Sequence, residues 1–342
     1  MERKPERVTV LGAGSWGSML ANLLYENGYQ VKMWSIDPKQ VKELNTKHTN
    51  ERYMKGFTYP KGLVTYNQMD KAVEGADDVF VVVPAQATRS TAKNLNRCLE
   101  QADLKPNVID ASKGIEKGTY DLMYQVLDSE IDADHMKSLS VLSGPTQAES
   151  VAVKDMTLVT VASKNSDAAR HFQKMLMAPY FRVYTNDDVI GSETGGAMKN
   201  IIAIGAGVLA SMGYKDNATA ALMTRGLAEI ERLGHAFGAN PLTFTGLSGL
   251  GDLIVTATSS NSRNWRAGYQ LGQGKSPKEI VENMGQVVEG AATVKAAHDL
   301  AQRKKIDMPI TNAIYEVWYN HADVKAEIKK LMQRPPRPEF YK

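Results

Sequence analysis

The sequence is almost without cysteine, because Cys98 is the single thiol among 342 residues. One thiol can form neither a disulfide within the chain nor a cysteine-based metal cluster, so we expect a reducing, cytoplasmic setting and no bound metal. Long apolar runs are also lacking, and the stretch 201–210 is too short to cross a bilayer. No apolar segment with a cleavage site follows the first residues. We therefore expect neither a secretory signal nor a membrane span.

Charge of one sign is not in large excess. The 41 lysines and arginines stand against 38 acidic residues, a net charge of +3, and the basic residues are scattered rather than arranged in a stripe. This argues against a nucleic-acid groove and suits a small anionic substrate. A length of 342 residues exceeds what one hydrophobic core normally serves, so we expect two domains.

Hydrophobic patterning changes along the chain near residue 190. Before that point short Val- and Ile-rich runs alternate with helical patterns, which predicts a parallel sheet with crossover helices. The expected strands are 8–12, 30–34, 78–84, 107–112, 138–144, 156–163 and 181–186. Helical patterns between them lie near 16–27, 38–47, 86–101, 119–129, 146–153 and 165–177. Later segments show only helical periodicity, at 193–212, 217–237, 263–272, 276–284, 287–304, 309–320 and 324–333.

The first expected strand runs directly into a glycine-rich turn and then a helix. Gly12, Gly14 and Gly17 have the spacing of a dinucleotide-binding turn. The first glycine allows the tight turn, the second lets backbone approach a pyrophosphate, and the third lets helix pack on strand. A turn without a ligand does not explain three glycines at these offsets. We predict a Rossmann-like dinucleotide-binding domain over residues 1–190 and an all-helical substrate and catalytic domain over residues 191–342.

An acidic residue follows the second expected strand. Asp37 lies 20 residues after Gly17, a distance at which a carboxylate accepts hydrogen bonds from the adenosine ribose and favours NAD over NADP. It also precedes Pro38 and could cap the next helix instead. The two interpretations carry equal weight, and the choice between NADH and NADPH stays open.

A single lysine interrupts an uncharged helical stretch between Thr194 and Tyr214. Lys199 has no carboxylate three, four or seven residues away in its own helix. Burial would lower its pKa and leave a neutral amine able to take a proton near pH 7. The alternative is that the side chain extends along its stem to water, as lone lysines usually do. Lys199 lies near the boundary of the two expected domains, where a ligand held by both would bind.

Two further polar segments follow expected strands at their carboxyl ends, where open α/β sheets bind ligands. Lys113 comes directly after the strand NVIDA and its serine, and it offers donors to an anionic or carbonyl substrate. A solvated loop lysine is the alternative. The segment that contains Gly144 and Thr146 follows the strand SLSVL in the same way.

Ser262 opens a helix in the second half of the chain. It can cap that helix, while Arg263 and Asn264 present donors at the helix's positive end, an arrangement suited to a phosphate. Asp252 lies among glycines. It is either an ordinary turn residue or a carboxylate that orients a lysine or a substrate hydroxyl, and the sequence leaves both interpretations open.

Together these segments resemble the bacterial NAD(P)-dependent glycerol-3-phosphate dehydrogenase family. The resemblance covers nearly the whole chain, with the family's motifs in the family's order: GAGSWG, SKGIE, LSGPTQAE, GGAMKNIIAI, TRGLAEI, GLGDLIVT, SRNWRAG, VVEG and MPI. It implies reversible hydride transfer between NAD(P)H and dihydroxyacetone phosphate, which supplies sn-glycerol 3-phosphate for phospholipid synthesis. It also implies a homodimer.

The resemblance implies roles for the residues that match these motifs. Lys199 would be the proton acceptor in catalysis, assisted by Lys113 and Asp252. The substrate would contact Lys113, Gly144, Thr146, Lys199, Asp252, Thr256, Ser262, Arg263 and Asn264. The dinucleotide would contact Gly12, Gly14, Ser15, Trp16, Gly17, Ile36, Asp37, Tyr53, Lys113, Ala148, Arg263, Val287 and Glu289.

One position departs from the family's pattern. Members of the family that use NADPH often have His or Arg after the second strand, where this chain has Ile36 and Asp37. Recognition of a 2′-phosphate is therefore not implied by this segment.

Two other functions are compatible with the sequence. One is a reductase of the same two-domain design that acts on β-hydroxyacids or on 6-phosphogluconate. The other is a nucleotide-sensing protein that keeps the fold without turnover. The presence of Lys199, Asp252 and Arg263 together argues against the second, because a protein without turnover has no need of all three.

Overall fold

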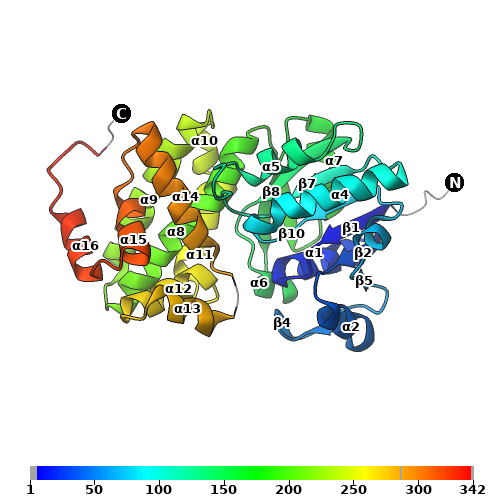
Figure 1. Ribbon diagram of the computed structural model, residues 1–342, viewed down its shortest axis with the longest axis horizontal. Helices are drawn as coiled ribbons and strands as arrows, with labels where there is room; N and C mark the ends of the chain where they lie inside the picture. Colours follow the sequence, from blue (N-terminus) through cyan, green and yellow to red (C-terminus); the bar gives the residue numbers. More distant parts are fainter. Residues whose placement is uncertain (1–5, 286, 340–342) are drawn as a thin grey trace.

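The computed structural model describes residues 6–285 and 287–339, and its first half is built on one eight-stranded sheet (Figure 1). The strand order is β10-β9-β8-β7-β6-β1-β2-β5. The strands are β1 (Arg7–Leu11), β2 (Gln30–Trp34), β5 (Val64–Tyr66), β6 (Asp78–Val81), β7 (Asn107–Asp110), β8 (Ser138–Ser143), β9 (Thr157–Ala162) and β10 (Phe181–Asn186). Each strand expected from the sequence is present, and the Rossmann-like fold class is confirmed.

The sheet is not parallel throughout. β8 and β9 pair antiparallel, with Val141 opposite Ala162, and β10 runs parallel to β9. The expectation of a parallel sheet is therefore wrong for this pair. After β8 the chain forms α6 (Ala148–Ala152), which packs against the helix that follows the glycine turn. A buried strand has the same apolar pattern in either direction, so periodicity alone could not reveal the reversal.

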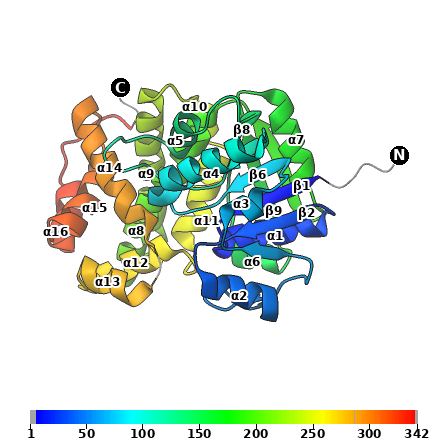
Figure 2. The ribbon, with the colours of Figure 1, turned by 45° about the vertical axis from the view of Figure 1, so that its right-hand side comes forward.

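Helices cover both faces of the sheet and bury its strands (Figure 2). One face packs against α1 (Ser15–Glu26) and α7 (Ser166–Leu176). The opposite face packs against α3 (Met69–Val73), α4 (Thr88–Ala102) and α5 (Met123–Glu130). At the sheet's edge α2 (Pro38–Lys47) packs beside β5. Because both faces are covered, the central strands are nearly continuous runs of Val, Ile and Leu.

Several short elements are not predicted by the patterning. They are β5, α3, a separate two-stranded sheet of β3 (Thr49–Asn50) and β4 (Met54–Thr58), and α10 (Pro241–Phe244) in the second half. None is longer than five residues. A segment of that length is too short for the helical or the strand period of hydrophobic residues to be recognised.

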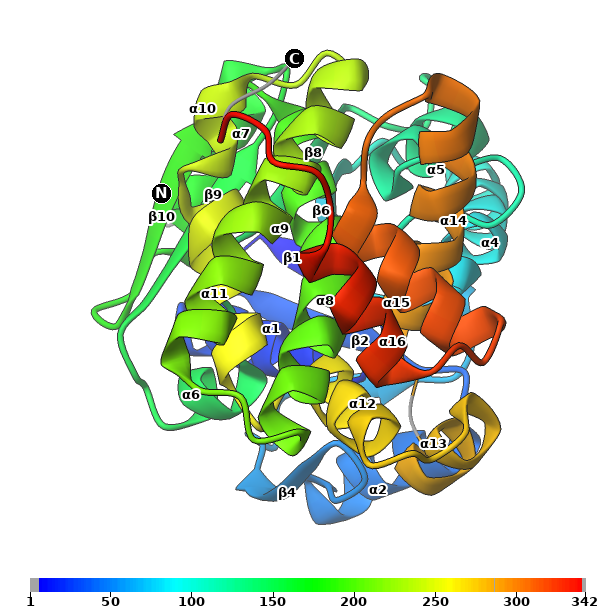
Figure 3. The ribbon, with the colours of Figure 1, turned by 90° about the vertical axis from the view of Figure 1, so that its left-hand side faces the viewer.

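Helices form the second half of the described chain (Figure 3). They are α8 (Val189–Ser211), α9 (Asp216–Ala236), α10, α11 (Asp252–Thr258), α12 (Arg263–Gly272), α13 (Pro277–Met284), α14 (Glu289–Lys304), α15 (Pro309–Tyr319) and α16 (Val324–Met332). α8 is buried along most of its length and contacts α9, α11, α12, α14 and α15. A helix that is apolar all round is stable only in such a central position.

The glycine-rich stretch before α11 is a π-helical turn, Leu247–Gly251, rather than a loop. α8 approaches this turn closely, since a Cβ on Gly195 would lie 2.3 Å from the Ser248 carbonyl oxygen. Only glycine at 195 permits that approach. The consequence is that Asp252, the first residue of α11, lies against the middle of α8.

α8 and α12 cross at a pair of glycines. A Cβ on Gly268 would lie 1.9 Å from the Ile204 carbonyl oxygen, and one on Gly207 would lie 2.0 Å from the Trp265 carbonyl oxygen. The two backbones are therefore in direct contact. This contact fixes where α12 begins, and with it the position of Arg263.

The expected domain boundary between residues 190 and 191 stays a prediction. The last strand ends at Asn186 and α8 begins at Val189, so the change of secondary structure falls close to it. None of the helices in residues 6–285 and 287–339 is both long and apolar enough to span a membrane.

Replacement of Gly268 tests the packing of α12 against α8. Gly268→Ala should lower the free energy of unfolding by about 1–3 kcal/mol, because its Cβ meets backbone that cannot move aside. Urea unfolding measures the difference. Gly246→Ala is the control, since its backbone has a negative φ and the nearest atom to its Cβ would be 3.3 Å away. Equal destabilisation by both substitutions would contradict the account.

Candidate active site

A cleft of about 1130 Å³ separates the carboxyl edge of the sheet from the helical half. Its walls are formed by the glycine turn, the segments after β6 and β7, the middle of α8, the start of α12 and the start of α14. Clefts at this edge of an open α/β sheet are where ligands bind. Both halves of the chain contribute side chains, so a ligand here would contact both.

The glycine turn after β1 has the geometry of a phosphate-binding turn. Gly12 has φ of +113°, and a Cβ there would lie 2.2 Å from the Val82 carbonyl oxygen. A Cβ on Gly17 would lie 1.9 Å from the Gly12 carbonyl oxygen. Gly14 caps α1 without a side chain, so the first N–H groups of that helix are available to an anion in the cleft. These features fit the pyrophosphate of a dinucleotide.

Two amide side chains donate hydrogen bonds to the backbone of the glycine turn. Gln40 Nε2 and Asn50 Nδ2 both donate to the Ala13 carbonyl oxygen, at 2.6 and 2.9 Å. Both side chains are buried. They come from α2 and β3, and the sequence contains no signal that would connect them with the turn.

Asp37 caps the next helix and also lies at the cleft. One carboxylate oxygen accepts a hydrogen bond from the Lys39 amide at 2.9 Å, which caps α2. The residue also lines the cleft, as does Ile36, whose side chain is exposed. The N-cap interpretation is confirmed, and the position remains compatible with a ribose.

Nearly all the predicted site residues share this one cleft. Those that line it are Gly12, Gly14, Ser15, Trp16, Gly17, Ile36, Asp37, Tyr53, Lys113, Thr146, Ala148, Lys199, Thr256, Ser262, Arg263, Asn264, Val287 and Glu289. Gly144 and Asp252 are not part of the wall. Each instead contacts a lysine that is.

Asp252 lies between two lysines. Its Oδ1 contacts the Lys199 Nζ, and its Oδ2 is 2.8 Å from the Lys113 Nζ. The carboxylate is fully buried, and Lys199 is only 6% exposed. Asp252 is therefore the residue that orients both amines rather than an ordinary turn aspartate.

Burial changes the acidity of Lys199. Loss of hydration lowers its pKa to about 7, while the Asp252 carboxylate raises it and the Lys113 ammonium lowers it further. The alternative, a side chain that extends to water, is excluded by its burial. A lysine near pKa 7 can take or give a proton under physiological conditions.

Lys113 is fixed in place rather than solvated. Besides Asp252, its Nζ donates to the Gly144 carbonyl oxygen at 3.2 Å and to the Thr146 Oγ1 at 3.5 Å. The loops after β7 and β8 thus converge on one ammonium group. This group lines the cleft beside Lys199 and can stabilise an oxygen that acquires negative charge.

Behind these lysines lies a buried carboxyl pair that the sequence analysis missed. Asp110, the last residue of β7, and Glu193, on α8, are both buried; burial raises the pKa of both, and the Asp110 charge raises that of Glu193 further. Asp110 Oδ1 accepts from the Ser112 amide at 3.0 Å, and Glu193 Oε1 accepts from the Tyr124 amide at 2.8 Å. The two acidic groups lie at the end of β7 and on α8, and the signal for them is a charged residue inside each of two apolar segments.

The start of α12 forms the corner of the cleft suited to phosphate. Ser262 Oγ accepts from the Trp265 amide at 3.3 Å, which confirms it as the cap of α12. Asn264 donates to Asn200 at 2.8 Å and accepts from the Gly290 amide at 2.9 Å. Asn200 also lines the cleft beside Lys199. The sequence analysis missed it, although a polar residue beside the lone lysine of an apolar helix was the available signal.

Glu289, the first residue of α14, has an unsatisfied carboxylate oxygen at the cleft. Its Oε2 is buried and without a hydrogen-bond partner among the described residues. Burial raises the pKa of this carboxyl. Glu289 also lines the cleft, where the Arg263 charge lowers its pKa against the effect of burial.

Comparisons with known proteins agree with this geometry. The family model for the N-terminus of NAD-dependent glycerol-3-phosphate dehydrogenase matches residues 7–169, and that for its C-terminus matches residues 188–329. A curated relative, glycerol-3-phosphate dehydrogenase [NAD(P)+] of Levilactobacillus brevis, is 56% identical over 98% of this chain and 99% of its own length.

Solved structures give the same result. The crystal structure of glycerol-3-phosphate dehydrogenase from Coxiella burnetii is similar at a TM-score of 0.91 and 36% identity, over 96% of this chain and 99% of its own. That of the enzyme from Saccharomyces cerevisiae is similar at a TM-score of 0.80 and 26% identity, over 96% of this chain and 100% of its own.

Removal of the carboxylate charge between Lys113 and Lys199 should destabilise the folded protein. Asp252→Asn leaves two buried amines without their carboxylate, and we expect the free energy of unfolding at pH 7 to fall by about 3–5 kcal/mol. Guanidinium unfolding measures it. The control is Asp307→Asn, which breaks half-exposed pairs with Arg334 and Arg337 and should cost about 1 kcal/mol or less. A loss at Asp252 no larger than at Asp307 would contradict the burial argument.

Proposed function

The chain belongs to the NAD-dependent glycerol-3-phosphate dehydrogenase family, and we propose that its buried Lys199 amine is the proton acceptor of that reaction. It is an NAD(P)-dependent oxidoreductase that interconverts dihydroxyacetone phosphate and sn-glycerol 3-phosphate. The observation that carries the proposed mechanism is the Lys113–Asp252–Lys199 arrangement at the wall of the cleft that also contains the glycine turn.

The dinucleotide would lie across the carboxyl edge of the sheet. Its pyrophosphate would bind the open N–H groups of α1 beside Gly14. At the far wall of the cleft, Glu289 would accept a hydrogen bond from a hydroxyl or amide group of the dinucleotide. When bound, the nicotinamide accepts or supplies the hydride. The glycine geometry and the position of Glu289 in the cleft wall support this placement.

Proton transfer is assigned to Lys199. In oxidation its neutral amine takes the proton of the carbon-2 hydroxyl, and in reduction the ammonium returns it. Lys113 would donate to the same oxygen and stabilise the charge that develops there. Asp252 keeps both amines in position without touching the substrate itself. The pKa of about 7 at Lys199 supports this division of roles.

The substrate phosphate is assigned to the start of α12. Arg263 offers two parallel donors, and Ser262 and Asn264 lie beside it in the cleft. Phosphate binding at this corner would hold carbon 2 near the lysines, so binding energy is used to orient the reacting atoms.

Family membership decides against the other functions that the sequence allowed. A reductase for β-hydroxyacids or 6-phosphogluconate would not match both glycerol-3-phosphate dehydrogenase models along the chain. Against a sensor without turnover stand the curated relatives, which are named as dehydrogenases and are 56% identical to this chain. From the resemblance alone, we further propose that the enzyme works in the cytoplasm as a homodimer and that its product supports phospholipid synthesis.

Initial-rate assays test the function directly. The purified chain should oxidise NADH or NADPH when dihydroxyacetone phosphate is added, and far more slowly with carboxylated keto acids. The rates with NADH and with NADPH also measure the cofactor preference. Because the chain has Asp37 where members that use NADPH have His or Arg, we predict no preference for NADPH. Turnover with the keto acids alone would exclude the proposed substrate.

The role of Lys199 predicts a pH profile. Its pKa of about 7 means that the neutral amine is present above that value, so kcat/KM for glycerol 3-phosphate oxidation should rise with pH and level off above about 7. Reduction needs the ammonium and should fall over the same range. Lys199→Ala should lower kcat by about 100- to 10,000-fold and leave the Kd of NADH unchanged. A profile without an inflection between pH 6 and about 8.5 would remove Lys199 from this role.

The phosphate corner predicts a selective defect in substrate binding. Arg263→Ala should weaken dihydroxyacetone phosphate binding by about 2–5 kcal/mol, seen as a raised KM with a smaller change in kcat. Arg266→Ala is the matched control, because Arg266 also lines the cleft but lies one helical turn farther along. If both variants raise KM equally, the phosphate is not held by the start of α12.

A further inference from the structure

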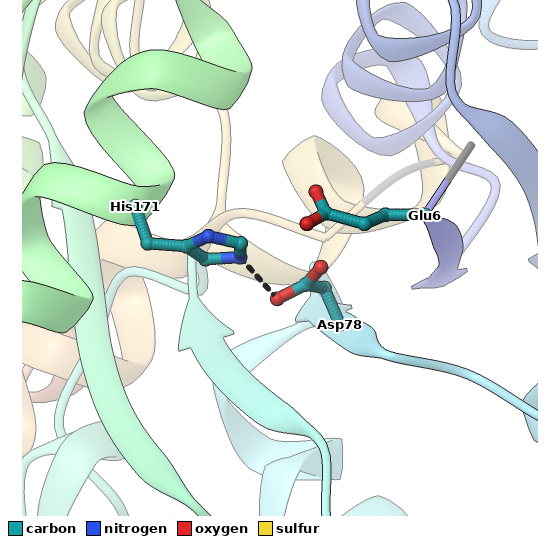
Figure 4. A group of neighbouring side chains, drawn as sticks. All are labelled: Glu6, Asp78 and His171. Atoms are coloured by element: carbon teal, nitrogen blue, oxygen red, sulfur yellow. Dashed lines mark hydrogen bonds and ion pairs between the residues drawn. The ribbon is translucent and has the colours of Figure 1, made fainter. Parts of the chain in front are cut away.

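Three side chains that offer metal ligands meet at the edge of the sheet opposite the cleft. Glu6 directly precedes β1, Asp78 is the first residue of β6, and His171 lies on α7 (Figure 4). β1 and β6 are parallel neighbours, so both begin at this edge, whereas the glycine turn follows the other end of β1. None of the three lines the dinucleotide cleft. The proposed mechanism makes no use of them.

Their ligand atoms converge on one point. One imidazole nitrogen and one oxygen from each carboxylate all lie within 4.8 Å of one another. His171 Nε2 is 2.7 Å from Asp78 Oδ1, which also accepts from Asn107 Nδ2 at 2.9 Å. The imidazole and the Glu6 carboxylate approach Asp78 from two sides, as Figure 4 shows.

The second carboxylate oxygen of Asp78 is unsatisfied. Asp78 is 0% exposed, and its Oδ2 is a buried atom without a hydrogen-bond partner among the described residues. A buried carboxylate oxygen with neither a donor nor a cation is rare, because its lost hydration is not compensated. Glu6 brings another carboxylate to the same place and makes the imbalance larger.

The charges of the cluster call for a cation. Among the described residues, His171 is the sole basic side chain in an ion pair with Asp78, and Glu6 has none. A protonated imidazole supplies one positive charge against two negative ones, and Lys137, whose charge acts on His171, forms no ion pair with either carboxylate among the described residues. A divalent cation bound by a neutral imidazole and two carboxylates balances them completely.

We propose that Glu6, Asp78 and His171 bind one divalent transition-metal ion of the Zn²⁺ class. One imidazole nitrogen and two carboxylate oxygens form a ligand set that zinc accepts and that calcium and magnesium do not favour. Binding requires the proton between His171 and Asp78 to leave and Glu6 to move inward, and the exposure of Glu6 permits that movement. The ion ties the segment before β1 to β6 and α7.

The three residues are far apart in the sequence, at 6, 78 and 171. No local spacing could predict the cluster, so the expectation of a protein without metal rested on the cysteine count alone. The proposed ion is structural, since it lies at the opposite edge of the sheet from the lysines. It is also independent of the function proposed for the cleft.

Zinc binding to the full-length chain tests the proposal. Protein stripped with a chelator is titrated with ZnCl₂ against a fluorescent zinc indicator, and thermal unfolding is followed with and without zinc. We expect about one tight site per chain and a higher Tm with zinc, because the ion binds the folded state. Glu6→Gln and His171→Gln should each weaken binding by about tenfold or more and remove the rise in Tm. Glu6 is exposed, so its variant should fold normally.

The matched control is His135→Gln. His135 also lies beside a carboxylate, 3.8 Å from Asp132, but no third metal-binding side chain joins them in the part of the chain that the structure describes, so its variant should bind zinc like the wild type. The proposal is overturned if the wild type has no tight site, if the Glu6 and His171 variants bind zinc unchanged, or if the His135 variant loses binding equally. Activity plays no part in this readout, so failure of the metal site and failure of the proposed enzyme are separate results.

Discussion

One buried carboxylate between two lysines is the interaction on which the site depends. Asp252 contacts the Lys199 amine and lies 2.8 Å from that of Lys113, and its own oxygens do not reach the cleft. A single negative charge cannot fully compensate two ammonium groups in a buried place. Since Lys199 is the more deeply buried amine, it is the one whose pKa falls to about 7. The chemistry proposed for the chain follows from this imbalance of charge.

Small residues along α8 make that contact possible. Glycine at 195 lets the turn before α11 approach, and a Cβ at Gly196 would lie 3.1 Å from Ser143 Oγ and 3.6 Å from the Lys113 side chain. Residues from β7, β8 and α11 therefore reach the same turn of α8. Ser143 Oγ, on β8, donates to the Ser192 carbonyl oxygen at 3.0 Å and adds a direct link between the sheet and this helix. Packing around Lys199 buries its amine, which keeps its pKa low.

Much of this arrangement could be predicted from the sequence, and the reasons for the rest are physical. Lone charges in apolar segments and glycines at fixed offsets are local signals, and they identified Lys199 and the turn at Gly12. The direction of β9 and the amides that hold the turn, such as Gln40, depend on contacts between distant segments. Asp252 could be singled out, but its position between two lysines could not, because the three residues come from three separate elements. The cluster of Glu6, Asp78 and His171 likewise depends on contacts between segments that are distant in the sequence.

The central claim concerns the protonation of one amine, and a direct titration tests it. With lysine side chains labelled with ¹³C and ¹⁵N, the Lys199 resonance is assigned by comparison with Lys199→Arg and followed by NMR as pH is raised. We predict a midpoint near 7, because burial lowers the pKa of Lys199 and the Asp252 carboxylate opposes that change only in part. A midpoint at about 10, the ordinary range of a solvated lysine, would contradict it.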